Sequence, residues 1–75
     1  MYTSIINKSL QLGERLKNTH MELHNISCVD DITCPRVLGV LYGCNALEQA
    51  SGINNIELRE ARIKNAINII KKNLN

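Results

Sequence analysis

Apolar side chains recur every three or four residues in the first third of the chain, which is the period of one face of an α-helix. The positions on this face are Tyr2, Ile5, Ser9, Leu12, Leu16, Thr19, Leu23 and Ile26. Ile6 and Leu10 widen the face. Ser9 and Thr19 interrupt it, and their hydroxyls either bond back to the preceding turn or set the register of a helix–helix contact. We therefore predict an amphipathic helix at about 3–26.

This period is lost over residues 25–34, and Pro35 then marks the start of a second helix. Proline suits the first turn of a helix because its missing N–H would have no partner there in any case. A side-chain oxygen before the proline is expected to cap this helix. The candidates for the cap are Asp30, Asp31 and Thr33. The predicted helix covers about 35–50, and its apolar face consists of Val37, Val40, Leu41, Cys44 and Leu47.

A second face of this helix is made of small residues. Its members are Gly39, Gly43, Ala46 and Ala50. A glycine in a helix interior costs about 1 kcal/mol relative to alanine, so two of them need a compensating gain. Close approach of a neighbouring helix supplies that gain through dispersion contacts. The helix is therefore predicted to be the central element, covered on more than one side.

The chain after this helix carries signals for a tight turn and a third helix. Gly52 is expected to adopt the left-handed conformation that closes a helix, with Ile53 folding back on it. Asn54 would then cap the next helix together with Glu57 three residues later. The third helix, at about 55–73, has a heptad-spaced apolar face. Its members are Ile56, Ile63, Ile67, Ile70 and Leu74.

These segments predict one all-α domain over residues 1–75, either a three-helix bundle or a helical hairpin with an additional N-terminal helix. A chain of 75 residues buries only about 60% of the surface that its unfolded form exposes, so a partner would add stability. We therefore expect a protein–protein interaction module, such as an adaptor, co-chaperone, inhibitor or regulator. Its partner would be another protein or a second copy, as in a homodimer. The predicted contact residues are Gly39, Gly43, Ile56, Ile63, Ile67 and Ile70.

DNA binding is the alternative function. Segment 47–64 loosely resembles a helix-turn-helix, and Arg59, Arg62 and Lys64 are its candidate DNA contacts. Residues 54–75 contain five basic and two acidic side chains, a local charge of +3, whereas the whole chain carries +2. This charge is modest for binding that depends on phosphate contacts, and a solvated helix face also explains it. The protein-interaction reading therefore ranks first.

The histidines and cysteines are candidate metal ligands and nucleophiles. His20, His24 and Cys28 fall at i, i+4 and i+8, and Cys34 and Cys44 could complete a zinc site. The spacing matches no compact zinc motif, however, and Cys44 lies on an apolar face where a thiol packs as a small hydrophobe. Cys34 is the best candidate for a reactive thiolate because it lies at a helix start. We predict no metal, no cofactor and no enzymatic activity.

Cysteine number and the N-terminal residues bear on the compartment. An odd count of three cysteines suits a reducing environment better than a disulfide-bonded secreted scaffold. Nothing near the first residue resembles a secretory signal. The longest apolar run, residues 37–44, is far shorter than the roughly 20 residues that cross a bilayer. The expectation is a cytoplasmic protein without membrane contact.

Overall fold

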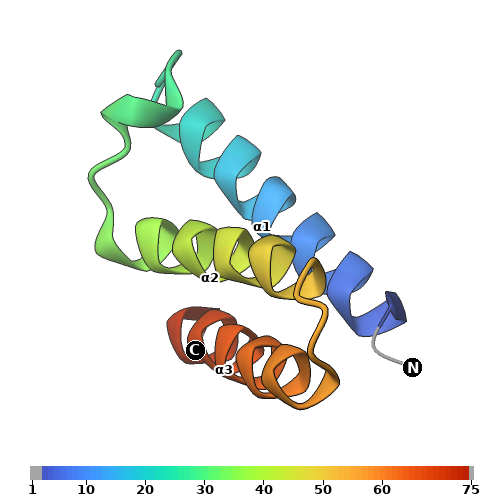
Figure 1. Ribbon diagram of the computed structural model, residues 1–75. Coiled ribbons are helices and arrows are strands. Elements are labelled where there is room, and N and C mark those ends of the chain that lie inside the picture. Colours follow the sequence, from blue (N-terminus) through green and yellow to red (C-terminus); the bar gives the residue numbers. More distant parts are fainter. Residues whose placement is uncertain (1–2, 75) are drawn as a thin grey trace.

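A computed structural model describes residues 3–74, which form three α-helices and contain no strand (Figure 1). The helices are α1 (Thr3–Leu23), α2 (Pro35–Ser51) and α3 (Ile56–Leu74), and a short 3₁₀ turn, Val29–Asp31, lies between α1 and α2. The predicted all-α class is confirmed. α1 ends before the predicted residue 26, and Tyr2, assigned above to its apolar face, lies outside the described residues.

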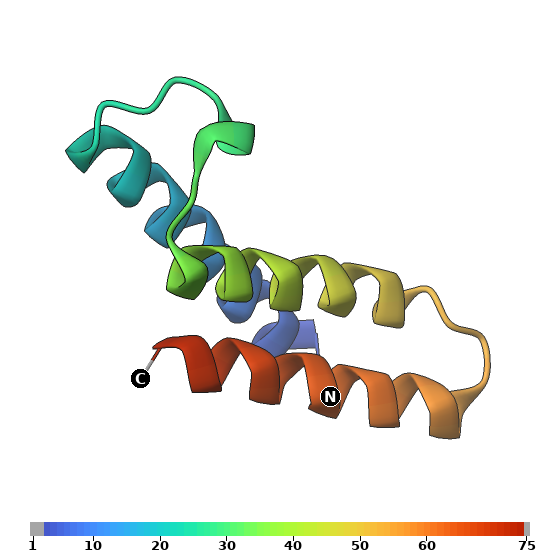
Figure 2. The ribbon, with the colours of Figure 1, turned by 90° about the vertical axis from the view of Figure 1, so that its left-hand side faces the viewer.

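α2 and α3 form an antiparallel hairpin (Figure 2). The first turn of α2 lies beside the last turn of α3, where the Arg36 guanidinium donates to the backbone carbonyls of Asn73, with an Nε–O distance of 2.8 Å, and Leu74. Those carbonyls have no partner within their own helix, and a cation also suits the negative end of the helix dipole. Arg36 therefore fastens the open end of the hairpin.

Glycine is required where the two helices approach most closely. A Cβ atom added to Gly43 would lie 2.6 Å from Ile70 Cγ1 and 3.3 Å from the carbonyl oxygen of Ala66. Gly39 likewise has the side chain of Asn73 directly against it. The predicted small-residue face of α2 thus packs against α3, as the sequence indicated.

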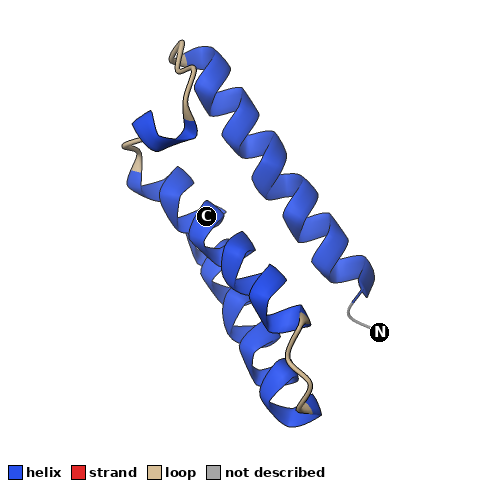
Figure 3. Cartoon of the chain, turned by 45° about the horizontal axis from the view of Figure 1, so that its top comes forward, coloured by secondary structure: helices blue, strands red, loops and turns tan. Residues whose placement is uncertain are grey.

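α1 crosses α2 on a different side (Figures 1 and 3). Gly13, the buried residue of α1, marks the crossing, because a Cβ added there would overlap Cys44 Sγ and lie 3.6 Å from Val40 Cγ1. α2 is therefore covered by α3 on its glycine side and by α1 on its valine and cysteine side, which confirms its predicted central position. Gly13 lies outside every face that was predicted from the sequence.

The core is aliphatic and centred on α2. Its buried members are Val40, Cys44, Leu47, Ala50, Ile63, Ala66 and Ile70. Val40 and Leu47 are fully buried, and burial of such a side chain contributes about 1.5–3 kcal/mol. Ile32, in the connector, is also buried, so the connector is anchored to the molecule by one apolar side chain.

The face of α1 that packs differs from the predicted one. Its packing side is centred on Gly13, and the half-buried Ile6, Leu10 and Leu16 flank it against the core. Ile5 and Leu12, which the periodicity assigned to the seam, are about half exposed. Because only a glycine leaves room for Cys44 at the crossing, the helix is rotated so that the predicted apolar face forms its flank.

The end of α1 uses the closing motif that was predicted for α2. Asn25 has a left-handed φ of 55°, and the N–H of Ile26 donates to the carbonyl of Met21 at 2.8 Å. The N–H of Asn25 donates to Glu22, which completes a Schellman motif with asparagine in the position that glycine usually takes. By contrast, Gly52 has φ −90°, so its predicted left-handed conformation is wrong.

Two predicted helix caps are also wrong. Asn55 caps α3, because its Oδ1 accepts a hydrogen bond from the N–H of Leu58 at 2.9 Å. The turn thus uses one more residue than predicted before α3 begins, which moves the cap from Asn54 to Asn55. Cys34 occupies the cap position of α2 and makes no side-chain cap bond. The candidate caps Asp30, Asp31 and Thr33 precede it and are exposed.

Candidate functional site

Most of the predicted partner-contact residues pack inside the chain. Gly43, Ile63 and Ile70 are buried between α2 and α3, and Ile67 is half-buried against the same core. Gly39 is covered by Asn73, so of this set only Ile56 is exposed. These residues hold the hairpin together, and a surface open to a partner must lie elsewhere.

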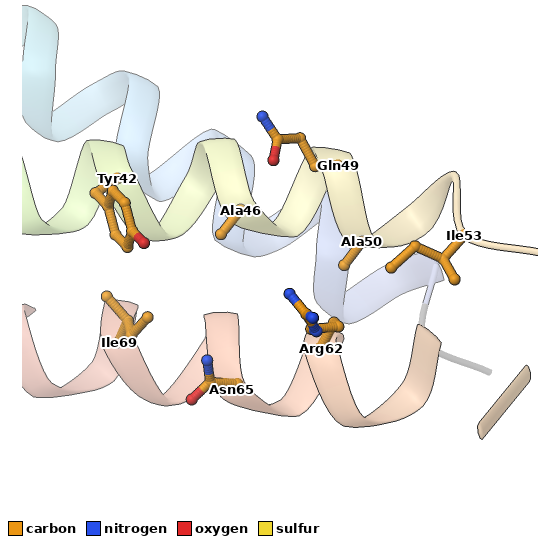
Figure 4. A pocket seen from close by; sticks show the side chains of 8 residues that line it. All are labelled: Tyr42, Ala46, Gln49, Ala50, Ile53, Arg62, Asn65 and Ile69. Carbon is orange, nitrogen blue, oxygen red and sulfur yellow. The ribbon is translucent and has the colours of Figure 1, made fainter. Parts of the chain in front are cut away.

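An open groove runs along the seam between α2 and α3 (Figure 4). It encloses about 350 Å³ and is lined by Tyr42, Ala46, Gln49, Ala50, Ile53, Arg62, Asn65 and Ile69. Tyr42 is two residues from both Val40 and Cys44 and therefore points about 200° around α2 from each. The groove thus lies on the side of the hairpin that α1 leaves uncovered.

The lining follows one face of each helix. On α2, Ala46 is four residues from both Tyr42 and Ala50 and three from Gln49, so these positions share one face, and Ile53 follows in the turn after the helix. On α3 the positions 62, 65 and 69 have the same helical spacing. Ala46 and Ala50 leave space between the two helices because each projects only a methyl group toward α3. The result is a groove between two helices in which the polar side chains of Gln49, Asn65 and Arg62 lie beside apolar ones.

The two ends of the groove differ in chemistry. Tyr42 and Ile69 point toward one another at one end, and Arg62 lies below Ala50 and Ile53 at the other (Figure 4). Tyr42 is 67% exposed and therefore presents most of its ring to a binding partner. Aromatic side chains of this kind dominate the energetics of many protein interfaces.

Arg62 is the one charged side chain that lines the groove. Residues 3–74 contain one ion pair, which joins Lys17 to Glu14. Arg62 therefore has no carboxylate partner among these residues. Leu58 lies one turn before Arg62 on the same face of α3 and is 45% exposed, and it extends the apolar surface. A guanidinium that has no carboxylate partner favours a ligand that brings one.

The candidate DNA contacts do not form one surface. Arg62 lines the groove, while Lys64 is two residues further along and points about 200° away around α3. Arg59 is half-buried. Segment 47–64 belongs to an antiparallel hairpin, whereas a helix-turn-helix needs its two helices at about 90–120°. The predicted helix-turn-helix arrangement is therefore not formed.

The candidate zinc ligands are not gathered into a site. The rings of His20 and His24 lie 4.5 Å apart between centroids, but no three side chains of His, Cys, Asp or Glu within residues 3–74 come together as a metal site. Cys28 is exposed and Cys44 is buried. The half-buried Cys34 directly precedes α2.

Cys44 packs as the small hydrophobe that the sequence predicted. Burial, followed by the nearby carboxylates of Glu48 and Glu14, raises the pKa of its thiol above the ordinary value of 9.0. Its Sγ lies 3.7 Å from the carbonyl oxygen of Ser9, to which the thiol donates weakly. A thiol held in its protonated form is a poor nucleophile. The contacts of Cys44 with Ser9 and Gly13 make it part of the α1–α2 packing.

No helix within residues 3–74 combines the length and the apolar character that crossing a membrane requires. Comparisons with protein-family models, with curated proteins and with solved structures found no match to this chain. The features that bear on function are therefore those of the chain itself: three α-helices, with a groove of mixed polar and apolar lining open along the α2–α3 seam.

Proposed function

We propose that this protein is a protein–protein interaction module whose α2–α3 groove binds an amphipathic helix of another protein. The observation that carries the proposal is the open groove of about 350 Å³ between two helices, which is lined by both apolar and polar side chains and has at one end Arg62, an arginine with no ion pair within residues 3–74. An amphipathic helix lying in such a groove buries residues spaced at i, i+3, i+4 and i+7. It would complete a helical bundle around the hairpin.

The side chains of the groove favour binding over catalysis. None of the residues lining it is a cysteine, a histidine or a carboxylate, and these groups most often serve as nucleophiles or as general acids and bases. Tyr42 offers a large contact area at a low cost in conformational entropy. The proposed role is to occupy the surface of another protein in the cytoplasm, as an adaptor, co-chaperone, inhibitor or regulator does.

Charge defines the partner further. Arg62 forms no ion pair with the described part of the chain, and the groove contains no acidic side chain. A partner helix with Asp or Glu beside its apolar stripe would give Arg62 a bidentate carboxylate contact. The binding helix is therefore expected to be acidic and amphipathic.

A displayed library of helical peptides tests the proposal directly. We expect selection on the folded protein to enrich peptides with apolar residues at i, i+3, i+4 and i+7 and with a carboxylate next to that stripe. Tyr42→Glu should lower the affinity of the protein for the selected peptides by about 30-fold or more, as expected for an interface anchor. Arg62→Glu should weaken them by about 10-fold or more, and selection on this variant should enrich basic peptides instead.

Lys64→Glu is the matched control, because Lys64 is exposed on α3 but points away from the groove. It should leave peptide affinity within about 2-fold, and its smaller effect should fade with added salt. Failure to enrich any helical peptide, or equal loss of binding in the Lys64 and Arg62 variants, would contradict the proposal. Retention on duplex DNA that falls steeply with salt and needs Arg59, Arg62 and Lys64 would favour the DNA-binding alternative instead.

A further inference from the structure

The flank of α1 carries an exposed apolar stripe. Ile5 is 46% exposed, Leu12 47% and Leu23 78%. These three residues belong to one line of positions that alternates by four and three residues. The full stripe is Ile5, Ser9, Leu12, Leu16, Thr19 and Leu23. It overlaps the packed face centred on Gly13 at two positions, because Leu16 is half-buried against the core and the Ser9 carbonyl accepts from Cys44. The open part of the stripe is therefore Ile5, Leu12, Thr19 and Leu23.

We propose that this stripe forms a homodimer in which α1 of one copy packs antiparallel to α1 of a second copy. The stripe is a heptad seam, the pattern by which two helices pack side by side. A hollow of about 200 Å³ lies along the charged border of the stripe, lined by Leu12 of the stripe and by Lys8, Gln11 and Arg15. This dimer is separate from the groove and does not depend on what the groove binds.

The order of residues along the stripe suits a two-fold axis near its middle. With Leu12 opposite Leu16 of the second copy, Ile5 comes opposite Leu23 of the second copy, which forms an apolar layer at each end. The same register places Ser9 opposite Thr19 of the second copy, where their hydroxyls can hydrogen-bond. Apolar residues thus meet apolar ones and polar residues meet polar ones. The polar layers penalise a shifted register, because a slip would bury a hydroxyl against leucine.

Charges along the border of the stripe select the antiparallel orientation. Lys8, Arg15 and Glu22 follow one border at seven-residue spacing and are all exposed. In the antiparallel arrangement Lys8 lies next to Glu22 of the second copy, and the pair occurs twice by symmetry. In a parallel arrangement this border would face the Gly13 and His20 side of the second helix, where no carboxylate is available. Opposite charges are therefore brought together only by the antiparallel dimer.

Arg15 weakens the same antiparallel dimer by charge repulsion. It lies near the two-fold axis, where it meets Arg15 of the second copy, and like charges at such a position weaken association. The stripe is also short: from residue 5 to residue 23 it spans about 27 Å of helix. A contact of one such face lies at the small end of stable interfaces, so we expect a dissociation constant roughly in the micromolar range.

Sedimentation equilibrium of the full chain, from about 1 to about 500 µM at low salt, tests the dimer. Lys8→Glu and Glu22→Lys should each raise the dissociation constant by about 10-fold, because each turns two attractive pairs into repulsive ones. The double variant carrying both changes should return to within about 2-fold of the original value. Arg15→Gln should tighten the dimer by a few-fold. Circular dichroism of each variant checks that the helices persist, since these side chains are exposed.

A chain that stays monomeric across this concentration range would overturn the proposal and would leave the stripe to another protein. A dimer whose affinity ignores both single reversals would also overturn it, because the contact would then be parallel or on another face. The same conclusion would follow if the double variant failed to restore affinity. Tyr42→Glu should leave the dimer unchanged, so a failure of the groove proposal and a failure of the dimer proposal are distinguishable.

Discussion

Replacement of Gly43 by leucine tests the contact on which the hairpin depends. Even a Cβ at this position would lie 2.6 Å from Ile70 Cγ1 and 3.2 Å from Ile69 Cγ2, and a leucine adds three more carbons beyond it. Ile70 is 2% exposed and has a branched side chain with little rotamer freedom. The carbonyl oxygen of Ala66, at 3.3 Å, belongs to backbone and cannot turn aside. The two helices must therefore separate.

Two opposing terms set the size of the effect. Overpacking a close contact costs about 1–3 kcal/mol, and the backbone contact at Gly43 favours the upper end of this range. Leucine in place of glycine recovers about 0.8 kcal/mol of helix propensity. The free energy of unfolding should therefore fall by about 2 kcal/mol. This is a large share of the roughly 4–11 kcal/mol that is typical of a domain of this size.

Thermal unfolding followed by circular dichroism measures this loss, and the midpoint should fall by about 8–16 °C. Gly52→Ala is the matched control, because a Cβ there meets only the carbonyl oxygen of Gln49 at 3.6 Å and the φ of −90° suits alanine. It should raise stability by about 0.4–1 kcal/mol. A melting temperature of Gly43→Leu within about 2 °C of the original would refute the close approach of α2 and α3.

Two further outcomes follow from the helix caps and from the buried thiol. Asn55→Ala should lower the free energy of unfolding by about 1 kcal/mol, while Asn54→Ala should change it little, because Asn55 holds the first turn of α3. A larger loss in the Asn54 variant, measured by urea unfolding, would return the cap to Asn54. The raised pKa of Cys44 means that the unfolded chain loses this proton at lower pH than the folded chain. The contribution of the protonated thiol to the free energy of unfolding should therefore be fully present below about pH 9 and be lost as the pH rises through the folded-state pKa. The decline should be smaller in Cys44→Ala.

The helices themselves were predictable from local signals. The start of α2 at Pro35 follows from the lack of an N–H in proline, and the two glycines of α2 correctly indicated a close neighbour. Such features depend on the chain within a few residues of each position, and the sequence displays them directly. The all-α class and the central place of α2 followed from them.

Which face of α1 would pack was not predictable in the same way. Its periodic stripe is real, but Gly13 opposite Cys44 decides the rotation of the helix, and this pairing joins residues that are distant in sequence. The cap at Asn55 and the right-handed conformation of Gly52 likewise depend on the path that the turn takes to bring α3 alongside α2. Local patterns do not contain that path.

Local signals specify the three helices and the need to cover the glycine side of α2, because helix propensity and amphipathic periodicity act over short stretches of chain. Which apolar residues remain available depends on how the helices pack against one another. Ile63 and Ile70 are buried between α2 and α3, whereas Tyr42, Ile69 and the flank of α1 remain accessible. Burial is a property of pairs of helices, and the antiparallel hairpin covers one side of each helix while leaving the other side free.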